Sequence, residues 1–313
     1  LEQLMATAAL FGVHPSHAFT SVETSPEYAD RPRLNVLKKA GVSRVSIGIQ
    51  SFQDEELKAI KRRPRQNTIY QALDDIRQMD FPYFNIDLIY GIKGQTVESF
   101  LYSLEEALRF QPNELFIYPL YVRQGTGITE REPDDVCFRM YRAACKLLQA
   151  KGFLQTSMRR FIHHPSTDAE VSCGDEVMLS CGSGGRSYLG DLHYATRYTV
   201  CQQCIAREID EYMATTDFTV ARNGFILSAK EQQQRFIIKN LMYYMGIDKA
   251  EYTRRFGEPL DRTPLFRQLA EQYWIEETPE RIRLTPEGLG YSDYIGQLFI
   301  TPEIRQLMET YSY

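Results

Sequence analysis

Polar side chains stand at or near the ends of apolar strand patterns in the first half of the sequence. Glu23, Gln50 and Asp87 mark three such patterns, and a loop begins at Pro119 after a fourth. Carboxylates and an amide can together accept hydrogen bonds from ribose hydroxyls, an α-amino group or an amide edge. Arg62 can reach the same region and bind a carboxylate through two parallel hydrogen bonds. Each residue alone is more simply a cap or loop residue, but four polar strand ends together predict a binding site.

These residues share one rim only if the strands are parallel. The predicted strands cover residues 18–22, 44–49, 84–89 and 114–118, and the helical patterns between them cover 32–39, 55–61, 68–79 and 97–110. Alternation of strand and helix is typical of βαβ units, which form parallel sheets. Ligands bind at the carboxyl ends of such strands. The sequence therefore predicts an α/β domain with its site at that edge.

The middle of the chain is less regular. A helix is predicted over 136–150 and a short strand over 154–158, and a glycine-rich run follows at 179–190. The run lacks the Gly-Lys-Ser/Thr ending of a phosphate-binding P-loop. Its glycines more simply allow the backbone to approach a ligand or a neighbouring strand closely.

The last part of the chain changes to a mainly helical pattern. Predicted helices at 229–244, 249–256 and 264–271 precede two short β runs, 274–277 and 281–284. Three helices followed by a hairpin is the order of a winged helix. Because no recognition helix is basic, we expect a packing or lid element instead of a DNA-binding one. The predicted domains are 1–135, 136–224 and 225–313.

Composition narrows the class of protein. The chain has 313 residues, a net charge of −5 and 25% charged residues. The mildly acidic composition does not indicate binding to nucleic acid, and no apolar run is long enough for a transmembrane helix. Six irregularly spaced cysteines do not form a secreted disulfide pattern, so a reducing cytoplasm is expected.

The cysteines leave two interpretations open. Cys201 and Cys204 form a C-x-x-C pair that could join Cys173 and Cys181 in a four-thiolate zinc or iron–sulfur site. Both members of the pair fall on a predicted helix, and no paired knuckles are present, so ordinary reduced thiols are favoured. Adjacent His163 and His164 are interpreted as surface residues.

Three segments resemble one known family. They are 21–26 (SVETSP), 41–52 (GVSRVSIGIQSF), and 85–91 (NIDLIYG) with the later Gly94-Gln95-Thr96. In wording, order and spacing they resemble the oxygen-independent coproporphyrinogen III oxidase-like (HemN/HemW-like) family of the radical S-adenosylmethionine (SAM) superfamily. Residues 118–123 and 157–161 are more similar to an uncharacterised branch than to the oxidase itself. The segment 284–288 resembles the closing domain of the family.

The resemblance implies a partial, TIM-like (β/α)6 barrel that holds SAM and a [4Fe-4S] cluster. An electron donor reduces the cluster, and a 5′-deoxyadenosyl radical then abstracts hydrogen from a small-molecule substrate, by analogy a tetrapyrrole. By matching position, Glu23 would contact SAM, while Gln50, Arg62, Asp87 and the Pro119 backbone would line the SAM region. Some members bind a second SAM there.

The sequence departs from the family in its cluster motif. The C-x-x-x-C-x-x-C segment and a downstream Gly-Gly-Thr are absent, and no cysteine of the chain has that spacing. The chain opens at Leu1 inside a helical pattern, and four predicted strands are too few to close a barrel. We therefore expect a fragment that is inactive alone, with amino-terminal barrel strands and cluster ligands upstream of Leu1 and no metal ligands within it.

Two rival functions remain at this stage. One is a haem-binding or haem-delivery chaperone on the same scaffold, with His193, His163 and the cysteines as its only candidate axial ligands. The other is a non-catalytic interaction protein.

Overall fold

The chain folds into two compact units. The computed structural model describes residues 2–13, 18–63, 65–123, 125–163, 177–197, 199–260 and 263–310. The first unit comprises residues 1–122 and 130–165, and the second comprises 123–129 and 166–313. Each is described by itself. Among the described residues, no helix is both long and apolar enough to span a bilayer.

The first unit is built on a six-stranded sheet with the order β1-β2-β3-β4-β6-β5. Its parallel strands are β1 (Ser21–Thr24), β2 (Arg44–Gln50), β3 (Tyr83–Tyr90) and β4 (Glu114–Pro119). The predicted parallel α/β arrangement is confirmed, and the sheet is open, not closed into a barrel. The first predicted strand, 18–22, was placed too early, so Glu23 lies within β1.

The far edge of this sheet differs from the prediction of one strand over 154–158. The structure has two short antiparallel strands, β5 (Leu154–Gln155) and β6 (Arg160–Ile162), and β6 pairs with β4. Ser157 makes the turn between them, because its Oγ accepts from the backbone N–H groups of Arg159 (3.3 Å) and Arg160 (3.1 Å). Hairpins this short have too few residues to show an alternating pattern in sequence.

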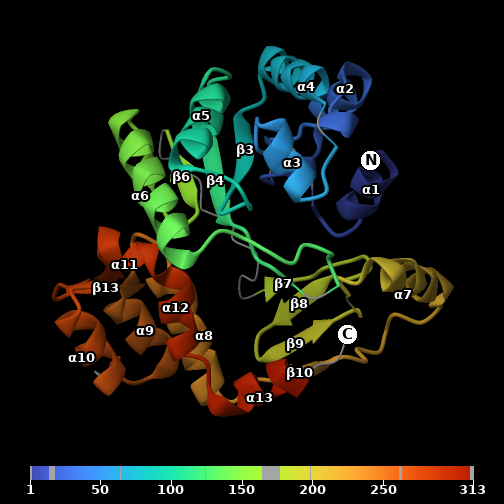
Figure 1. Cartoon of the computed structure of the whole chain (residues 1–313). Coiled ribbons are helices and arrows are strands. Elements are labelled where there is room, and N and C mark those ends of the chain that lie inside the picture. Colours follow the sequence, from blue (N-terminus) through green and yellow to red (C-terminus); the bar gives the residue numbers. More distant parts are fainter. Residues whose placement is uncertain are drawn as a thin grey trace. The chain divides into compact units, whose positions relative to one another are not determined.

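Helices accompany the parallel strands (Figure 1). The helical elements of this unit are α1 (Glu2–Ala9), η1 (Pro26–Tyr28), α2 (Arg31–Lys39), α3 (Asp54–Ala59), α4 (Gln66–Met79), α5 (Val97–Leu108) and α6 (Asp134–Ala150). Asp30 caps α2, and Thr96 and Ser99 form a capping box on α5. Gly41 ends the α2 turn at φ 72°, a left-handed conformation that glycine adopts without strain.

The second unit begins with an antiparallel sheet that the sequence did not predict. It has the order β10-β9-β8-β7, with β7 (Val177–Met178), β8 (Arg186–Leu189), β9 (Leu192–Ala195) and β10 (Gly224–Ile226). The glycine-rich run forms the turn between β7 and β8. A Cβ on Gly185 would lie 3.0 Å from the Gly182 carbonyl oxygen, so this glycine allows a close contact within the turn itself, not with a neighbouring strand. Helix α7 (Gln202–Ala214) lies between β9 and β10 in sequence.

The end of the chain has the predicted winged-helix order. The helices are α8 (Ala229–Leu241), α9 (Lys249–Phe256), α10 (Pro264–Glu271), α11 (Pro286–Gly290), α12 (Ser292–Leu298) and α13 (Pro302–Thr310). The hairpin of β12 (Ile275–Glu277) and β13 (Arg281–Leu284) gains a third strand, β11 (Ile247–Asp248). Apolar side chains such as Leu241, Ile247 and Ile295 form the buried core of this part.

A candidate binding site on the polar face of the parallel sheet

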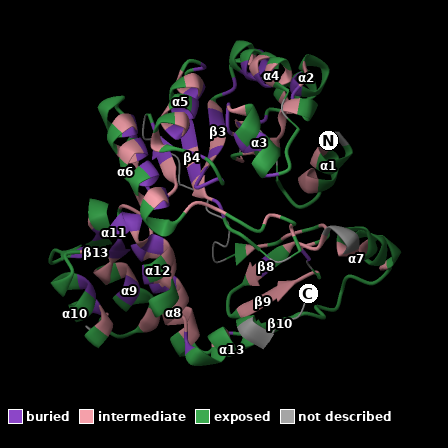
Figure 2. Ribbon diagram, in the orientation of Figure 1, coloured by how far each residue is buried: buried purple, intermediate pink, exposed green. Residues whose placement is uncertain are grey.

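The two faces of the parallel sheet differ sharply in polarity. Along β2, Val45, Ile47 and Ile49 are buried, and the intervening side chains are polar or absent. Successive side chains of a strand point to opposite faces, so one face is apolar and the other polar. Helices α5 and α6 pack against β3, and buried residues run along β3 and β4 (Figure 2).

Strand register gathers the polar residues of four strands into one row. Glu23 pairs with Ser46, Ser46 with Asn85, and Asn85 with Glu114. Asp87 lies on the same side of β3, two residues beyond Asn85. We call this surface the polar face; its members are Ser21, Glu23, Arg44, Ser46, Asn85, Asp87, Glu114, Phe116 and Tyr118.

Hydrogen bonds tie the centre of the polar face together. Asn85 Nδ2 donates to Asp87 Oδ1 (2.7 Å) and to Ser46 Oγ (2.7 Å), and Ser46 Oγ donates to Asp87 Oδ2 (3.2 Å). Both Asn85 amide protons are thereby used. Asn85 Oδ1 is buried and accepts no hydrogen bond from any described residue. An unpartnered buried acceptor is costly, so this atom fits a donor supplied by a ligand.

The Asp87 carboxyl is electrostatically unusual. Burial raises its pKa to about 6, against the hydrogen bond from Asn85, and the nearby Glu23 carboxylate raises it further. Arg44 and the Ser46 hydroxyl act in the opposite direction. Burial, followed by the charges of Asp87 and Glu23, also raises the pKa of Tyr118. At neutral pH the polar face therefore carries a largely ionised, half-buried carboxylate that favours a cation.

The arginines of the polar face are engaged at its amino-terminal end. Arg44 Nε donates to Glu114 Oε2 (2.7 Å), and Arg160 pairs with the other carboxylate oxygen of Glu114. Arg44 Nη1 also donates to Ser21 Oγ (3.0 Å). Because Glu114 binds these two cations, Glu23 and Asp87 dominate the charge further along the strands.

Gln50 is placed by a distortion at the end of β2. Its φ is +71°, which is uncommon for a residue with a side chain, and the pairing with β3 shifts between Gly48 and Gln50. A Cβ on Gly48 would lie 2.4 Å from Gln50 Nε2, so the amide folds back over Gly48 onto the polar face. Strained backbone of this kind is often found at binding sites.

A buried carboxylate fixes the loops that follow β2 and β3. Glu56 of α3 is almost fully buried, and its Oε2 accepts from Ser51 Oγ (2.6 Å) and Gln95 Nε2 (2.8 Å). Its Oε1 accepts from Ser99 Oγ. Gln95 in turn donates to the Ile89 carbonyl (3.2 Å). Glu56 therefore holds both loops at the carboxyl edge in fixed positions.

The remaining predicted residues lie further out. Pro119 ends β4, and the following amide of Leu120 donates to the Tyr90 carbonyl (2.8 Å). Arg62 lies beyond α3, is exposed, and donates through its backbone amide to the Leu57 carbonyl (2.8 Å). The structure brings Glu23 and Asp87 together and folds Gln50 onto the same face, but it gives the Arg62 guanidinium no contact with them.

The sequence interpretation missed Ser46, Asn85 and Glu56. Ser46 and Asn85 could have been found from strand alternation, because Asn85 lies two residues before Asp87 and Ser46 lies four residues before Gln50. Glu56 carries no such signal, since an acid in a first helical turn is ordinarily explained by the helix dipole.

The cysteines and histidines do not gather into a metal site. No group of three or more His, Cys, Asp or Glu suited to a metal is found in the described part of the chain, and Cys173 and His164 lie outside it. Cys204 lies in the first turn of α7 and Cys201 is the N-cap residue just before the helix, so the predicted helical setting is confirmed for Cys204 and not for Cys201.

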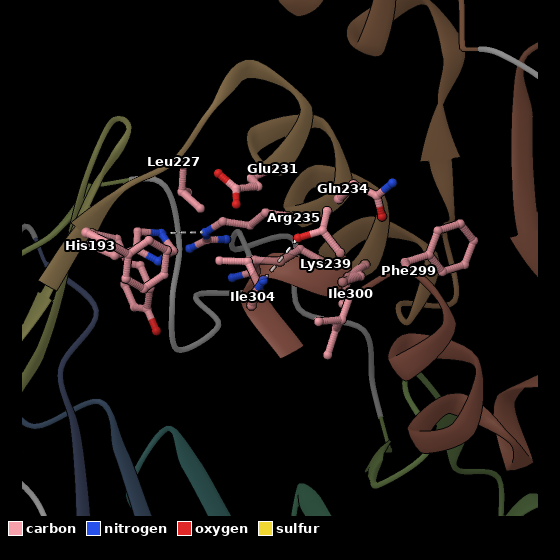
Figure 3. A pocket seen from close by; sticks show the side chains of 13 residues that line it. His193, Leu227, Glu231, Gln234, Arg235, Lys239, Phe299, Ile300 and Ile304 are labelled. Atoms are coloured by element: carbon pink, nitrogen blue, oxygen red, sulfur yellow. Dashed lines mark hydrogen bonds between the residues drawn. The ribbon is translucent and has the colours of Figure 1, made fainter. Parts of the chain in front are cut away.

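His193 lines a separate cavity of about 350 Å³ in the second unit (Figure 3). Its Nε2 accepts from Arg235 Nε at 3.0 Å, and burial followed by the Arg235 charge lowers its pKa to about 4. A guanidinium can only donate hydrogen bonds, so the lone pair of His193 Nε2 is occupied by the hydrogen bond from Arg235. An axial haem ligand needs that lone pair, so the geometry disfavours His193 Nε2 as one.

Two family models and several relatives match this chain. Residues 2–107 match the model of the radical SAM superfamily, and residues 227–290 match the HemN C-terminal domain. A haem chaperone HemW of Bacillus subtilis is 26% identical over 295 residues, covering 89% of this chain and 76% of the relative. An oxygen-independent coproporphyrinogen III oxidase of Thermostichus vulcanus is 25% identical over 291 residues, covering 86% and 89%.

A solved structure shares the fold. The coproporphyrinogen III oxidase HemN of Escherichia coli, described as a radical SAM enzyme, superposes with a TM-score of 0.72 at 21% identity, covering 91% of this chain and 70% of that one. The two family models identify a radical SAM region and a HemN-type C-terminal domain in the chain. Together with the relatives, these matches support a HemN/HemW-like radical SAM family for this protein. Its relatives carry the names of both an oxidase and a haem chaperone.

Proposed function

We propose that the polar face binds S-adenosylmethionine, and that the protein uses it for radical chemistry on a small molecule, by analogy a tetrapyrrole. The observation that carries this proposal is the pairing of a half-buried, largely ionised Asp87 with the buried, unpartnered acceptor Asn85 Oδ1. Together they favour a ligand that brings both a positive charge and a hydrogen-bond donor.

S-adenosylmethionine fits these demands. It carries a sulfonium, an ammonium, ribose hydroxyls and an amino group on its base. In the proposal, Asp87 and Glu23 accept from the ammonium and ribose groups, and Asn85 Oδ1 accepts a further donor. The folded-back Gln50 amide and the backbone at Pro119 line the remaining rim, and Arg62 would have to swing inward to meet the ligand carboxylate. When bound beside a reduced iron–sulfur cluster, this cofactor supplies hydrogen-atom abstraction.

The cluster itself does not fit the described cysteines. Cys137 and Cys145 lie on α6, and Cys181, Cys201 and Cys204 lie in the second unit, with no cluster-type grouping among them. The proposal therefore derives no step through a cluster. What the described residues do is hold the ligand: Asp87 supplies the counter-charge, Asn85 and Gln50 orient it, and Glu56 fixes the loops around it.

Ligand binding by this chain tests the assignment. Calorimetric titration should give binding of S-adenosylmethionine that strengthens as pH rises through about 6, because Asp87 then becomes ionised. The Asp87→Asn variant should bind at least about tenfold more weakly, a loss of roughly 1.4 kcal/mol, and should lose that pH dependence. The matched control is Asp135→Asn, which removes an exposed acid of α6. Equal affinity of wild type and Asp87→Asn would refute the site.

An anaerobic cleavage assay tests the wider reaction. A protein carrying its own cluster ligands, given a reductant or electron-donor protein in an anaerobic assay, should release 5′-deoxyadenosine. The proposed setting is a cytoplasmic one with a protein or small-molecule reductant and no nucleic acid. Failure to cleave the cofactor would contradict radical chemistry while leaving the binding test intact.

A further inference from the structure

The C-x-x-C pair lies at the first turn of α7, in the second unit and apart from the polar face. Cys201 is the N-cap of this 13-residue helix, and its carbonyl accepts from the amides of Cys204 (2.9 Å) and Ile205 (3.0 Å). Its own amide donates to Thr199 Oγ1 (3.1 Å). Residues three apart on a helix are neighbours, and this turn places the two sulfur atoms 3.0 Å apart.

The two thiols are not equivalent. Cys204 Sγ donates to Cys201 Sγ, and this hydrogen bond is the main cause that raises the pKa of Cys204. Cys201 is therefore the member that receives stabilisation as an anion. The partial positive charge of the helix start acts in the same direction at the N-cap. Both cysteines are partly exposed, so small molecules can reach them.

The other described cysteines lack this arrangement. Cys137 is buried, and burial raises its pKa. Burial also raises the pKa of Cys145 to about 11. Cys181 is exposed, but it lies in the turn between β7 and β8 and is not a helix cap. The chain thus provides both buried and exposed comparison thiols.

We propose that Cys201 and Cys204 form a reversible dithiol–disulfide site that exchanges with small-molecule disulfides. The Cys201 thiolate attacks one sulfur of oxidised glutathione and releases one glutathione thiol, leaving a mixed disulfide on Cys201. Cys204 then loses its proton and attacks the Cys201 sulfur, which releases the second glutathione. Two protein thiols are oxidised by two electrons, and one glutathione disulfide is reduced to two thiols, so the step balances.

Mass spectrometry of the protein treated with oxidised glutathione tests the exchange. The wild-type peptide that contains both cysteines should lose two hydrogen atoms and carry no stable glutathione. In Cys204→Ser the mixed disulfide should persist on Cys201, and in Cys201→Ser it should form slowly. Cys181→Ser is the matched control and should behave as wild type. Stable glutathione on Cys204 in the wild type, or equal behaviour of the two serine variants, would overturn the proposal.

Alkylation kinetics separate a reactive thiol from a merely structural one. With far-UV circular dichroism confirming an unchanged fold, Cys201 should react about threefold to tenfold faster than Cys181 at neutral pH, because the hydrogen bond from Cys204 and the start of α7 both stabilise a thiolate at this position. Tight binding of one zinc ion that is lost in both serine variants would assign the pair to a metal site and overturn the exchange.

Discussion

The parallel sheet of the first unit and the core of the C-terminal domain treat polar groups in opposite ways. The C-terminal core consists of buried apolar side chains from α8 to α12 and β11 to β13. The parallel sheet buries equally apolar residues on one face but places Ser46, Asn85 and Asp87 on the other. An apolar core maximises stability, whereas the polar face retains the unpartnered acceptor Asn85 Oδ1 and the Asp87 carboxyl, whose pKa is raised. This difference supports our proposal that the binding site lies in the first unit.

The largest expected effect is at the buried carboxylate beside the polar face. Glu56→Ala removes the acceptor of Ser51, Gln95 and Ser99, and we expect it to lower the free energy of unfolding by about 3–5 kcal/mol. Urea unfolding followed by circular dichroism measures this loss. The neighbouring Glu55→Ala is the control; its side chain is 85% exposed, and a change below about 0.5 kcal/mol is expected. Equal losses in the two variants would contradict the structural role of Glu56.

Substitutions in the apolar core of the C-terminal domain should change stability only through lost packing. Leu241→Ala removes a fully buried side chain and should cost about 3 kcal/mol, with no dependence on pH. The chain has one tryptophan, and Trp274 packs against this core, so its fluorescence reports unfolding there. Leu298→Ala, at a partly exposed position of α12, should shift the transition much less. A pH-dependent loss of unfolding free energy in Leu241→Ala would contradict the distinction between the apolar core and the polar face.

The polar face should instead carry a pH dependence. Because the folded-state pKa of Asp87 is raised from 3.8 to about 6, the folded protein binds a proton more tightly than the unfolded chain. The stabilisation of the protonated form is present below about pH 4 and is lost as pH rises to about 6. A shift of this size corresponds to about 2–3 kcal/mol. Unfolding curves of wild type and Asp87→Asn should diverge over this range; parallel curves would show that Asp87 titrates normally.

The smallest effect is expected at the exposed neighbour. Glu23→Gln removes the like charge that helps to raise the pKa of Asp87, so the midpoint of the Asp87 transition should move to lower pH. Because Glu23 is exposed, we expect a stability change under about 0.5 kcal/mol at neutral pH. Carboxyl carbon chemical shifts measured by NMR follow the titration directly. An unmoved midpoint would mean that burial alone sets this pKa.

Regular elements were predictable from sequence, and distortions were not. The strands over 44–49 and 84–89 and the helices over 249–256 and 264–271 have strong periodicity, and the structure has them within a residue or two. Strands β5 to β9 have two to four residues each, which is too short for an alternating pattern to stand out.

The same limit applies to the site residues: those placed by regular strands were predictable from sequence, and those placed by distortions were not. That Glu23 and Asp87 would lie on the same edge of the sheet, on the two strands that flank β2, followed from parallel βα units alone. The inward fold of Gln50 depends on a left-handed residue and a shifted register, which no local propensity specifies. The partners of Glu56 come from two segments, one after β2 and one after β3, and only the tertiary fold brings them together.

The contact between Gly48 and Gln50 makes these two positions epistatic. A methyl group at position 48 would occupy the space of the Gln50 amide, 2.4 Å from its nitrogen. A side chain at 48 therefore displaces the Gln50 amide from the polar face, whereas a shorter residue at 50 makes room for it. The effect of a substitution at either position on this rim thus depends on the residue at the other.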